Sequence, residues 1–247
     1  RRCLTGAPRC DGCGEAAGCD FAALLGAPEA GVPGEEPRPF WWRGVPSRQT
    51  LEAGERFDVT CLTVADALPA EAGLDDAFTS ALMRLGTGPA RPHDVVVVGE
   101  EVLAWGEPDG GRRVRLVAET PLQLRGDLAR SRDNCPALPW LALLVSAGIR
   151  RVAALVERYG SAEVPRVRMP RLDGLRVLAD GLEATRLSRF AVRQGKRVPI
   201  EGWTGAVTVE GDAVVGLWGL LRALEVTGVG KGTSLGLGAL RVDEAVE

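Results

Sequence analysis

The apolar residues in the second half of the chain change repeatedly between the spacing of a strand and that of a helix. Alternation of apolar and polar positions predicts a half-buried strand, whereas apolar residues three and four apart predict an amphipathic helix. The expected elements, in chain order, are a strand at 114–124, a helix at 138–159, strands at 182–193 and 200–209, a helix at 214–224 and a strand at 235–242. A basic turn, 194–197, joins the two middle strands. This order is that of a ferredoxin-like split βαβ domain.

The first half carries a weaker form of the same pattern. Alternation at 56–64 and a valine-rich run at 94–105 predict strands, and helical spacing at 74–85 predicts a helix between them. No strand and helix precede these elements, so a ferredoxin-like first domain would lack its opening strand and helix. We therefore expect an α+β protein with two ferredoxin-like (RRM-like) domains, 1–109 and 113–247.

The composition is that of a folded globular protein, because 45% of the 247 residues are hydrophobic and 26% are charged. No apolar run approaches the roughly 20 residues of a membrane-spanning helix, and the N-terminus lacks the apolar stretch of a signal peptide. We therefore expect a cytoplasmic protein. The formal net charge of −3 argues against a surface that is basic throughout. A nucleic-acid site would have to be a local basic patch.

Four of the six cysteines crowd the N-terminus: Cys3, Cys10, Cys13 and Cys19. In a cytoplasmic protein such a cluster more often holds a metal than forms disulfides, because thiolates stay reduced there and suit tetrahedral zinc. The pair Cys10-x2-Cys13 has the spacing of a zinc knuckle, whereas the flanking gaps are wider than usual. A structural zinc site and four unligated thiols both stay open. Residues 1–36, rich in Gly, Ala, Pro and Cys, would form an insert that a metal could staple.

A second unusual segment, 228–238, packs five glycines into eleven positions ahead of the chain's end. It is not a Walker loop, because Lys231 is followed by Gly232 and Glu225 stands where the first glycine should be. It is not a dinucleotide-binding fingerprint either, since too few residues follow Gly238 to form the required βαβ unit.

Two interpretations of this glycine-rich segment remain. Its backbone N–H groups and Lys231 could hold a phosphodiester backbone, with contacts from Gly228, Gly230, Thr233 and Ser234. Alternatively, the glycines only let the last strand pass close under a helix.

Several short motifs occur in an order that resembles one protein family. They are Glu119–Leu124, Arg150-Arg151 with Tyr159-Gly160, the basic run 186–197, Gly202–Val207 and the glycine-rich segment. Together they resemble the C-terminal half of the Cas-six family, the CRISPR-associated RAMP-superfamily endoribonucleases that cut repeat RNA into guide RNAs. The cysteine cluster followed by Asp20-Phe21 also looks like a feature of one branch of that family.

The resemblance implies two RAMP domains, binding of a CRISPR repeat hairpin, and metal-independent cleavage on the 3′ side of the stem by the RNA's own 2′-hydroxyl. The partners would be repeat RNA or the crRNA hairpin, together with other Cas proteins of an effector complex. Catalysis would need no cofactor, and a bound zinc would be structural. The alternative is a non-catalytic subunit that binds the crRNA hairpin without cutting it.

Cleavage by a 2′-hydroxyl needs a base, an acid for the 5′-oxygen and cations for the phosphorane. His93 is the chain's one histidine, and imidazole suits the acid/base task because it titrates near neutrality. A surface histidine with no role is the competing interpretation. Lys231 is the preferred candidate for stabilising the charge of the transition state.

Phosphate contacts are expected from the basic run around the predicted turn: Arg189, Arg193, Lys196 and Arg197. Alternation along a strand would place the first two on one face. The competing interpretation is a solvated basic hairpin. The aromatic residues are few, and Trp203 and Trp218 fall in apolar patterns, so both are expected in the core.

Overall fold

The computed structural model describes residues 40–43, 60–63, 110–125, 138–160, 169–191 and 195–245. The chain divides into two compact units. The first comprises Arg1–Phe40, Arg48–Arg56 and Thr63–Ala104, and the second comprises Trp41–Ser47, Phe57–Leu62 and Trp105–Glu247. All described residues except Phe40 and Thr63 belong to the second unit, and the architecture that follows is that of this unit.

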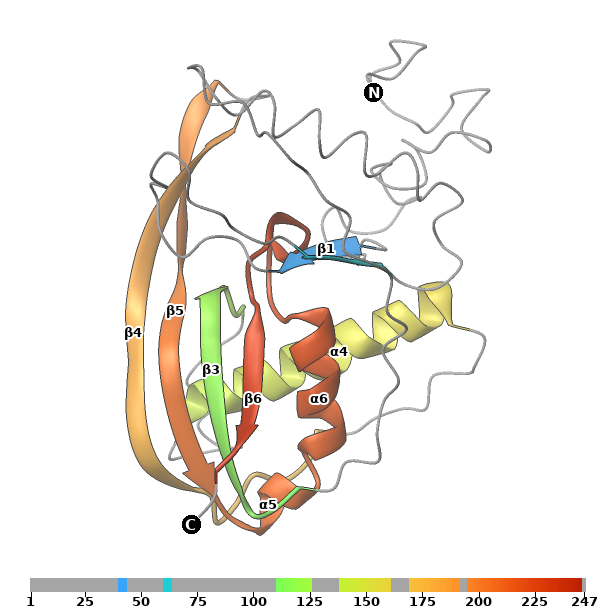
Figure 1. The fold of residues 1–247 in the computed structure, drawn as a ribbon, viewed down its shortest axis with the longest axis vertical. Coiled ribbons are helices and arrows are strands. Elements are labelled where there is room, and N and C mark those ends of the chain that lie inside the picture. Colours follow the sequence, from blue (N-terminus) through green and yellow to red (C-terminus); the bar gives the residue numbers. More distant parts are fainter. Residues whose placement is uncertain are drawn as a thin grey trace. The chain divides into compact units, whose positions relative to one another are not determined.

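The second unit contains an antiparallel four-stranded sheet in the order β4-β5-β3-β6 (Figure 1). Its elements are β3 (Arg113–Leu122), α4 (Pro139–Tyr159), β4 (Arg176–Ala191), β5 (Lys196–Glu210), the short α5 (Asp212–Val215), α6 (Trp218–Thr227) and β6 (Leu240–Glu244). The predicted strand, helix, strand, strand, helix, strand order is confirmed for this half of the chain. A ferredoxin-like fold for the first half and a boundary between 109 and 113 stay predictions.

Two short strands, β1 (Phe40–Arg43) and β2 (Thr60–Thr63), form a separate two-stranded sheet. β2 lies within the strand predicted at 56–64. Segments 41–47 and 57–62 are assigned to the second unit, and Trp41 and Arg43 make hydrogen bonds to its helix α6 and its strand β6.

Two elements differ from the predicted ones for identifiable reasons. β4 begins at Arg176, whereas the predicted strand begins at 182. The prediction missed the first residues because Leu178 is an extra residue between two paired positions and interrupts the alternation. The helix predicted at 214–224 is two helices, α5 and α6, separated by Gly216 and Leu217.

One face of the sheet carries the hydrophobic core. Val114, Leu116 and Ala118 of β3 are buried and alternate with more exposed residues. α4 and α6 cover this face, and the same core cluster includes Val207 and Val209 of β5, Leu240 and Val242 of β6, and Leu141, Leu144, Val145, Leu221 and Leu224 of the two helices. The sheet and both helices therefore share one core.

Trp218, at the start of α6, is part of this core and is only 1% exposed. Its indole Nε1 donates to the carbonyl of Gly111 at 2.7 Å. The expectation that Trp218 is a core residue is confirmed.

A close contact between α4 and α6 depends on Gly148 of α4, where an added Cβ would lie 2.6 Å from the side chain of Leu224.

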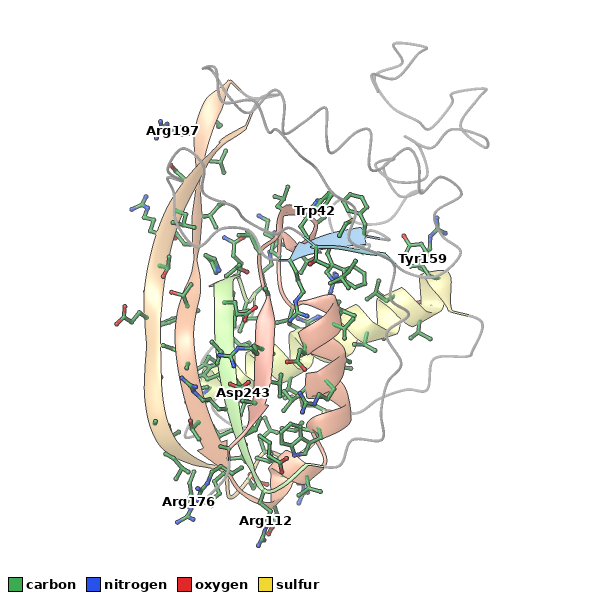
Figure 2. The ribbon with its side chains drawn as sticks, in the orientation of Figure 1. Trp42, Arg112, Tyr159, Arg176, Arg197 and Asp243 are labelled. Carbon is green, nitrogen blue, oxygen red and sulfur yellow. The ribbon has the colours of Figure 1, made fainter. Side chains whose placement is uncertain are left out.

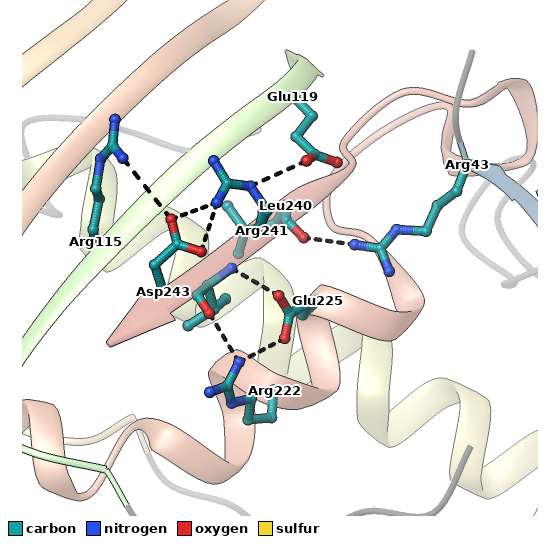
Figure 3. A network of polar contacts seen from close by, with 9 residues as sticks. Arg43, Arg115, Glu119, Arg222, Glu225, Leu240, Arg241 and Asp243 are labelled. Atoms are coloured by element: carbon teal, nitrogen blue, oxygen red, sulfur yellow. Dashed lines mark hydrogen bonds and ion pairs between the residues drawn. The ribbon is translucent and has the colours of Figure 1, made fainter. Parts of the chain in front are cut away.

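The opposite face of the sheet is charged. Glu210 of β5 pairs with Arg113 at 2.9 Å and with Arg176 at 2.5 Å. Asp243 of β6 pairs with Arg241 at 2.6 Å, and Figure 3 shows this cluster beside the neighbouring strand. The described side chains of β3, β5 and β6 on this face include no aromatic ring, so it lacks the base-stacking platform of an RRM sheet.

The outer edge of β6 is covered by side chains (Figure 3). Arg43 donates to the carbonyl of Leu240 at 3.0 Å, and Arg222 donates to the carbonyl of Val242 at 2.8 Å. Glu225 accepts the N–H of Val242 at 2.9 Å. Unpaired edge groups invite pairing with another chain, so these caps close the edge.

α4 is the one helix among the described residues that is long and apolar enough to cross a membrane by length and composition alone. Arg150 and Arg151 interrupt its apolar sequence. Its buried side chains, including 141–145 and Leu155, pack into the core of this unit.

Candidate nucleic-acid interface

The glycine-rich segment 228–238 forms the loop between α6 and β6, and it lies against the end of β3. The N–H of Lys231 donates to the carbonyl of Gln123 at 3.0 Å. Gly230 has a φ of 88°, and an added Cβ there would lie 2.6 Å from the same carbonyl oxygen. Only glycine adopts this conformation at so short a distance without strain. This favours the packing interpretation for Gly230.

The loop has its own internal structure. Thr233–Leu235 forms a 3₁₀ turn flanked by two glycines in the left-handed conformation, which is why β6 begins at Leu240 rather than 235. Thr233 is only 8% exposed, and its methyl group lies beside Gly228. Ser234 is half-buried and is the more accessible of the two hydroxyl residues.

Lys231 is exposed although its backbone is fixed. Its ammonium group makes no hydrogen bond or ion pair with any described residue. A lysine ammonium is a compact charge with three donors on a flexible stem. The loop therefore presents an unpaired positive charge from a backbone that is held to β3.

The start of the loop is fixed by a buried clamp beneath the end of α6, formed by Trp41 and Arg151. The indole Nε1 of Trp41 donates to the carbonyl of Val226 at 2.6 Å, and Nε of Arg151 donates to the carbonyl of Thr227 at 2.9 Å. The guanidinium carbon of Arg151 lies 5.5 Å from the centre of the Trp41 ring. A cation here also complements the negative end of the helix dipole.

Burial lowers the pKa of Arg151 to about 10. The guanidinium therefore stays charged at neutral pH. Its Nη2 is buried and has no hydrogen-bond partner among the described residues. The stacked ring and the carbonyl of Thr227 are the contacts that hold this charge inside the protein.

Lys231 opens onto a groove of about 580 Å³ between the end of β3 and the β4–β5 hairpin. The described residues that line it are Leu122, Gln123, Leu124, Arg125, Ala184, Thr185, Arg186, Pro199, Glu201, Gly202, Trp203 and Lys231. The hairpin extends past the ends of β3 and β6 (Figure 1). Alternation from Val207 and Val209 places Glu201 and Trp203 on the face of β5 that carries the core. The floor of the groove is therefore the part of the core-bearing face that α4 and α6 do not cover.

The groove is basic on balance. Arg125, Arg186 and Lys231 are its cations, and Glu201 is the one carboxylate among the described lining residues. Nε of Arg186 lies 3.4 Å from Oε1 of Glu201, and both side chains are largely exposed. Gln123 donates to the backbone carbonyl of Glu201 at 2.8 Å, which ties β3 to the hairpin. Arg125 and Lys231 have no ion-pair partner among the described residues and can interact with an anion.

The model of one protein family, described as the CRISPR-associated endoribonuclease Cas6, matches residues 116–240. This range runs from β3 to the first residue of β6 and includes the groove and the glycine-rich loop. The chain belongs to the Cas6 family. The expectation from the sequence motifs is confirmed at this level.

Two structures of Cas6 proteins are among the solved structures that match this chain. The product complex of Cas6 (TTHB231) from Thermus thermophilus has a TM-score of 0.50 and 15% identity, over 83% of this chain and 82% of that chain. A product complex of Cas6 (TTHA0078) has a TM-score of 0.45 and 21% identity, over 84% of this chain and 83% of that chain. No curated protein matches the sequence.

The basic residues predicted to contact RNA are divided between two places. Lys196 and Arg197 are exposed at the start of β5, near the tip of the hairpin, where Figure 2 shows Arg197. The backbone of Arg189 pairs with Val198 in the same part of the hairpin. Arg193 lies outside the described residues. Neither Lys196 nor Arg197 lines the groove beside Lys231, so these two cations form a separate basic region near the hairpin tip.

The other predicted site residues, His93 and the cysteines Cys3, Cys10, Cys13 and Cys19, also lie outside the described residues. Within the described part of the chain, no group of three or more His, Cys, Asp or Glu side chains is placed to hold a metal ion. The zinc site and the catalytic role of His93 stay predictions.

Three groove residues were not identified from the sequence as site residues: Arg125, Arg186 and Trp203. The expectation that Trp203 is a core residue is wrong, because its side chain is 42% exposed. It fits the apolar alternation of β5, but the hairpin continues past the region that the helices cover. The flanking glycines, Gly202 and Gly205, were the available sign that few side chains pack around this indole.

Proposed function

We propose that this Cas6-family chain binds the hairpin of CRISPR repeat RNA in the groove and cuts the precursor to give mature guide RNA. The observation that carries the proposal is Lys231, a cation on a fixed loop that has no ion-pair partner among the described residues and that lines one groove with Arg125 and Arg186. Three cations converging on one concave surface suit the phosphates of RNA, which supply most of the affinity in such complexes.

The cleavage that we propose uses the 2′-hydroxyl of the RNA as nucleophile and needs no metal ion. The 2′-oxygen forms a bond to the adjacent phosphorus while the bond from phosphorus to the 5′-oxygen breaks. A base takes the proton of the 2′-hydroxyl, and an acid supplies one to the 5′-oxygen, leaving a 2′,3′-cyclic phosphate and a 5′-hydroxyl. Lys231 would stabilise the charge of the phosphorane. His93 is the candidate for proton transfer.

The second candidate function is a subunit that binds the crRNA hairpin in an effector complex without cutting it. One observation favours it: Glu201, the one carboxylate in the described lining of the groove, is paired with Arg186. In either case we propose a cytoplasmic protein that works with repeat RNA and other Cas proteins.

A cleavage assay without metal separates the two functions. The protein is incubated in chelator with a labelled repeat hairpin from its own locus, and with the same RNA carrying a 2′-deoxy substitution at the cut nucleotide. A single cut that the deoxy substitution abolishes is expected for the endoribonuclease. Tight binding with both RNAs left intact would support the non-catalytic subunit, and failure to bind the hairpin would overturn the proposal.

A further inference from the structure

Trp203 lines the groove and is far more exposed to solvent than two other tryptophans of this protein. It is 42% exposed, whereas Trp218 is 1% exposed and Trp41 is 4% exposed. The indoles of Trp41 and Trp218 each donate a hydrogen bond and each lie beside an arginine. Among the described residues, no hydrogen-bond acceptor or cation engages Trp203.

The place of Trp203 on the hairpin explains this exposure. On the sheet it lies between Leu122 of β3 and Ala184 of β4. Its paired residue on β4, Ala184, is small, and Gly205, two positions along the same face of β5, has no side chain. The longer neighbours on that face, Arg186 and Glu201, pair with each other and leave the indole partly open. Exposing an indole costs hydrophobic free energy that burial would recover. A ring left open beside a basic groove is therefore best explained by a ligand.

The groove combines this ring with phosphate-binding cations. Trp203, Lys231 and Arg125 line the same groove, so one nucleotide chain can meet all three. Unpaired bases stack on exposed aromatic side chains, whereas bases inside a duplex are already stacked on one another. A stem alone would leave the ring uncovered except at its terminal base pair.

We propose that Trp203 is a binding residue that stacks on an unpaired base of the RNA while Lys231 and Arg125 hold the neighbouring phosphates. This inference rests on the proposed function of the groove and deepens it. The ligand is repeat RNA with at least one unpaired nucleotide next to the stem. The charged face of the sheet offers no such ring among its described residues, so the stacking site belongs to the hairpin.

The test is a binding titration with the repeat hairpin carrying its single-stranded flanks and a 2′-deoxy substitution at the cut nucleotide. Trp203→Ala is expected to weaken binding about 5- to 30-fold, the loss of one stacked base. Trp203→Phe keeps a ring and is expected to retain most of the affinity. Leu178→Ala is the matched control, because Leu178 is an exposed apolar residue, 46% exposed, that lies on β4 outside the groove.

A set of abasic RNAs tests the contact without changing the protein. One abasic position in the unpaired flank is expected to weaken binding of the wild-type protein by a similar factor and to leave the Trp203→Ala variant unaffected. If wild-type protein binds the hairpin tightly and no abasic position weakens it, the stacking inference is wrong while the proposed function stands. If wild-type protein does not prefer the hairpin to a plain RNA duplex of equal length, the proposed function itself fails.

Discussion

The charged side chain of Arg151 has a structural role, because its contacts are with Trp41 and with the end of α6. It lies inside the protein between Trp41 and the end of α6, where it stacks on the indole and donates to the carbonyl of Thr227. The residue after Thr227 opens the glycine-rich loop. The position of Lys231 in the groove therefore depends on a side chain that does not line the groove.

Replacing Arg151 with methionine is expected to lower the free energy of unfolding by about 1 to 3 kcal/mol, because the carbonyl of Thr227 loses its donor inside the protein. Arg150→Met is the control. Arg150 is the neighbouring exposed arginine, and its one hydrogen bond within the described part of the chain goes to Ser146 at 2.7 Å. Its loss is expected to cost less than about 0.5 kcal/mol. Urea unfolding curves compare the two, and equal midpoints would contradict a clamp at Arg151.

At the scale of an element, the glycine-rich loop is shaped by its approach to β3. Gly230→Ala would meet two costs, a left-handed backbone at a residue with a Cβ and a collision with the carbonyl of Gln123. Gly195→Ala meets only the first, since Gly195 has a φ of 60° and nothing lies within 4 Å of an added Cβ. We expect Gly230→Ala to be the more destabilising by about 1 to 3 kcal/mol.

The same pair of variants reports on the groove. A shift of the loop would move Lys231, so Gly230→Ala is expected to weaken RNA binding, while Gly195→Ala at the hairpin turn leaves Lys231 in place. Thermal unfolding and hairpin binding measured on both variants check the two effects separately. If the alanines prove equally harmful, close packing is not what the glycine at 230 provides.

The charged face of the sheet makes stability depend on pH. Hydrogen bonds from Arg113, and then from Arg176, lower the pKa of Glu210. A carboxylate whose folded pKa is depressed stabilises the protein above the pKa of the unfolded chain, about 4.3, and this stabilisation is lost as the pH falls through the folded value. Glu210→Gln is therefore expected to lower the melting temperature near neutral pH and to make it fall less steeply toward acid.

Glu157→Gln serves as the control for this prediction, because Glu157 is exposed on α4 and has no ion-pair partner among the described residues. Melting temperatures of both variants at about pH 7 and about pH 3 compare their acid dependence. A Glu210→Gln variant that follows the wild-type profile throughout would show that the pairs with Arg113 and Arg176 contribute nothing.

The order of elements in this half of the chain could be read from periodicity because its strands alternate and its helices have one apolar stripe. The same alternation misplaced Trp203, since period two identifies the face of a strand but not whether a helix covers it. It also missed the first residues of β4, where Leu178 shifts the register. The sequence alone could not assign Arg125 and Arg186 to one groove. Arg186 lies on β4, whereas Arg125 lies in the segment after β3, and only the fold brings the two together.

The whole molecule has a formal net charge of −3, which does not distinguish cations that are paired with carboxylates from cations that are not. Arg113, Arg176 and Arg241 are committed to carboxylates on the charged face of the sheet. Lys231 has no such partner in the described structure, and Arg125 has none either. An RNA would therefore release counterions mainly at the groove and the hairpin tip rather than over the surface at large.

The salt dependence of hairpin binding measures this division. The logarithm of the binding constant is expected to fall linearly with the logarithm of salt concentration, with about 0.7 to 0.9 of slope for each phosphate neutralised. Lys231→Ala is expected to weaken binding and to reduce the slope by about one. Arg171→Ala, which removes an exposed cation outside the groove, is expected to leave both unchanged. If the two variants lower affinity and slope equally, binding follows net charge alone, and Lys231 has no special place in it.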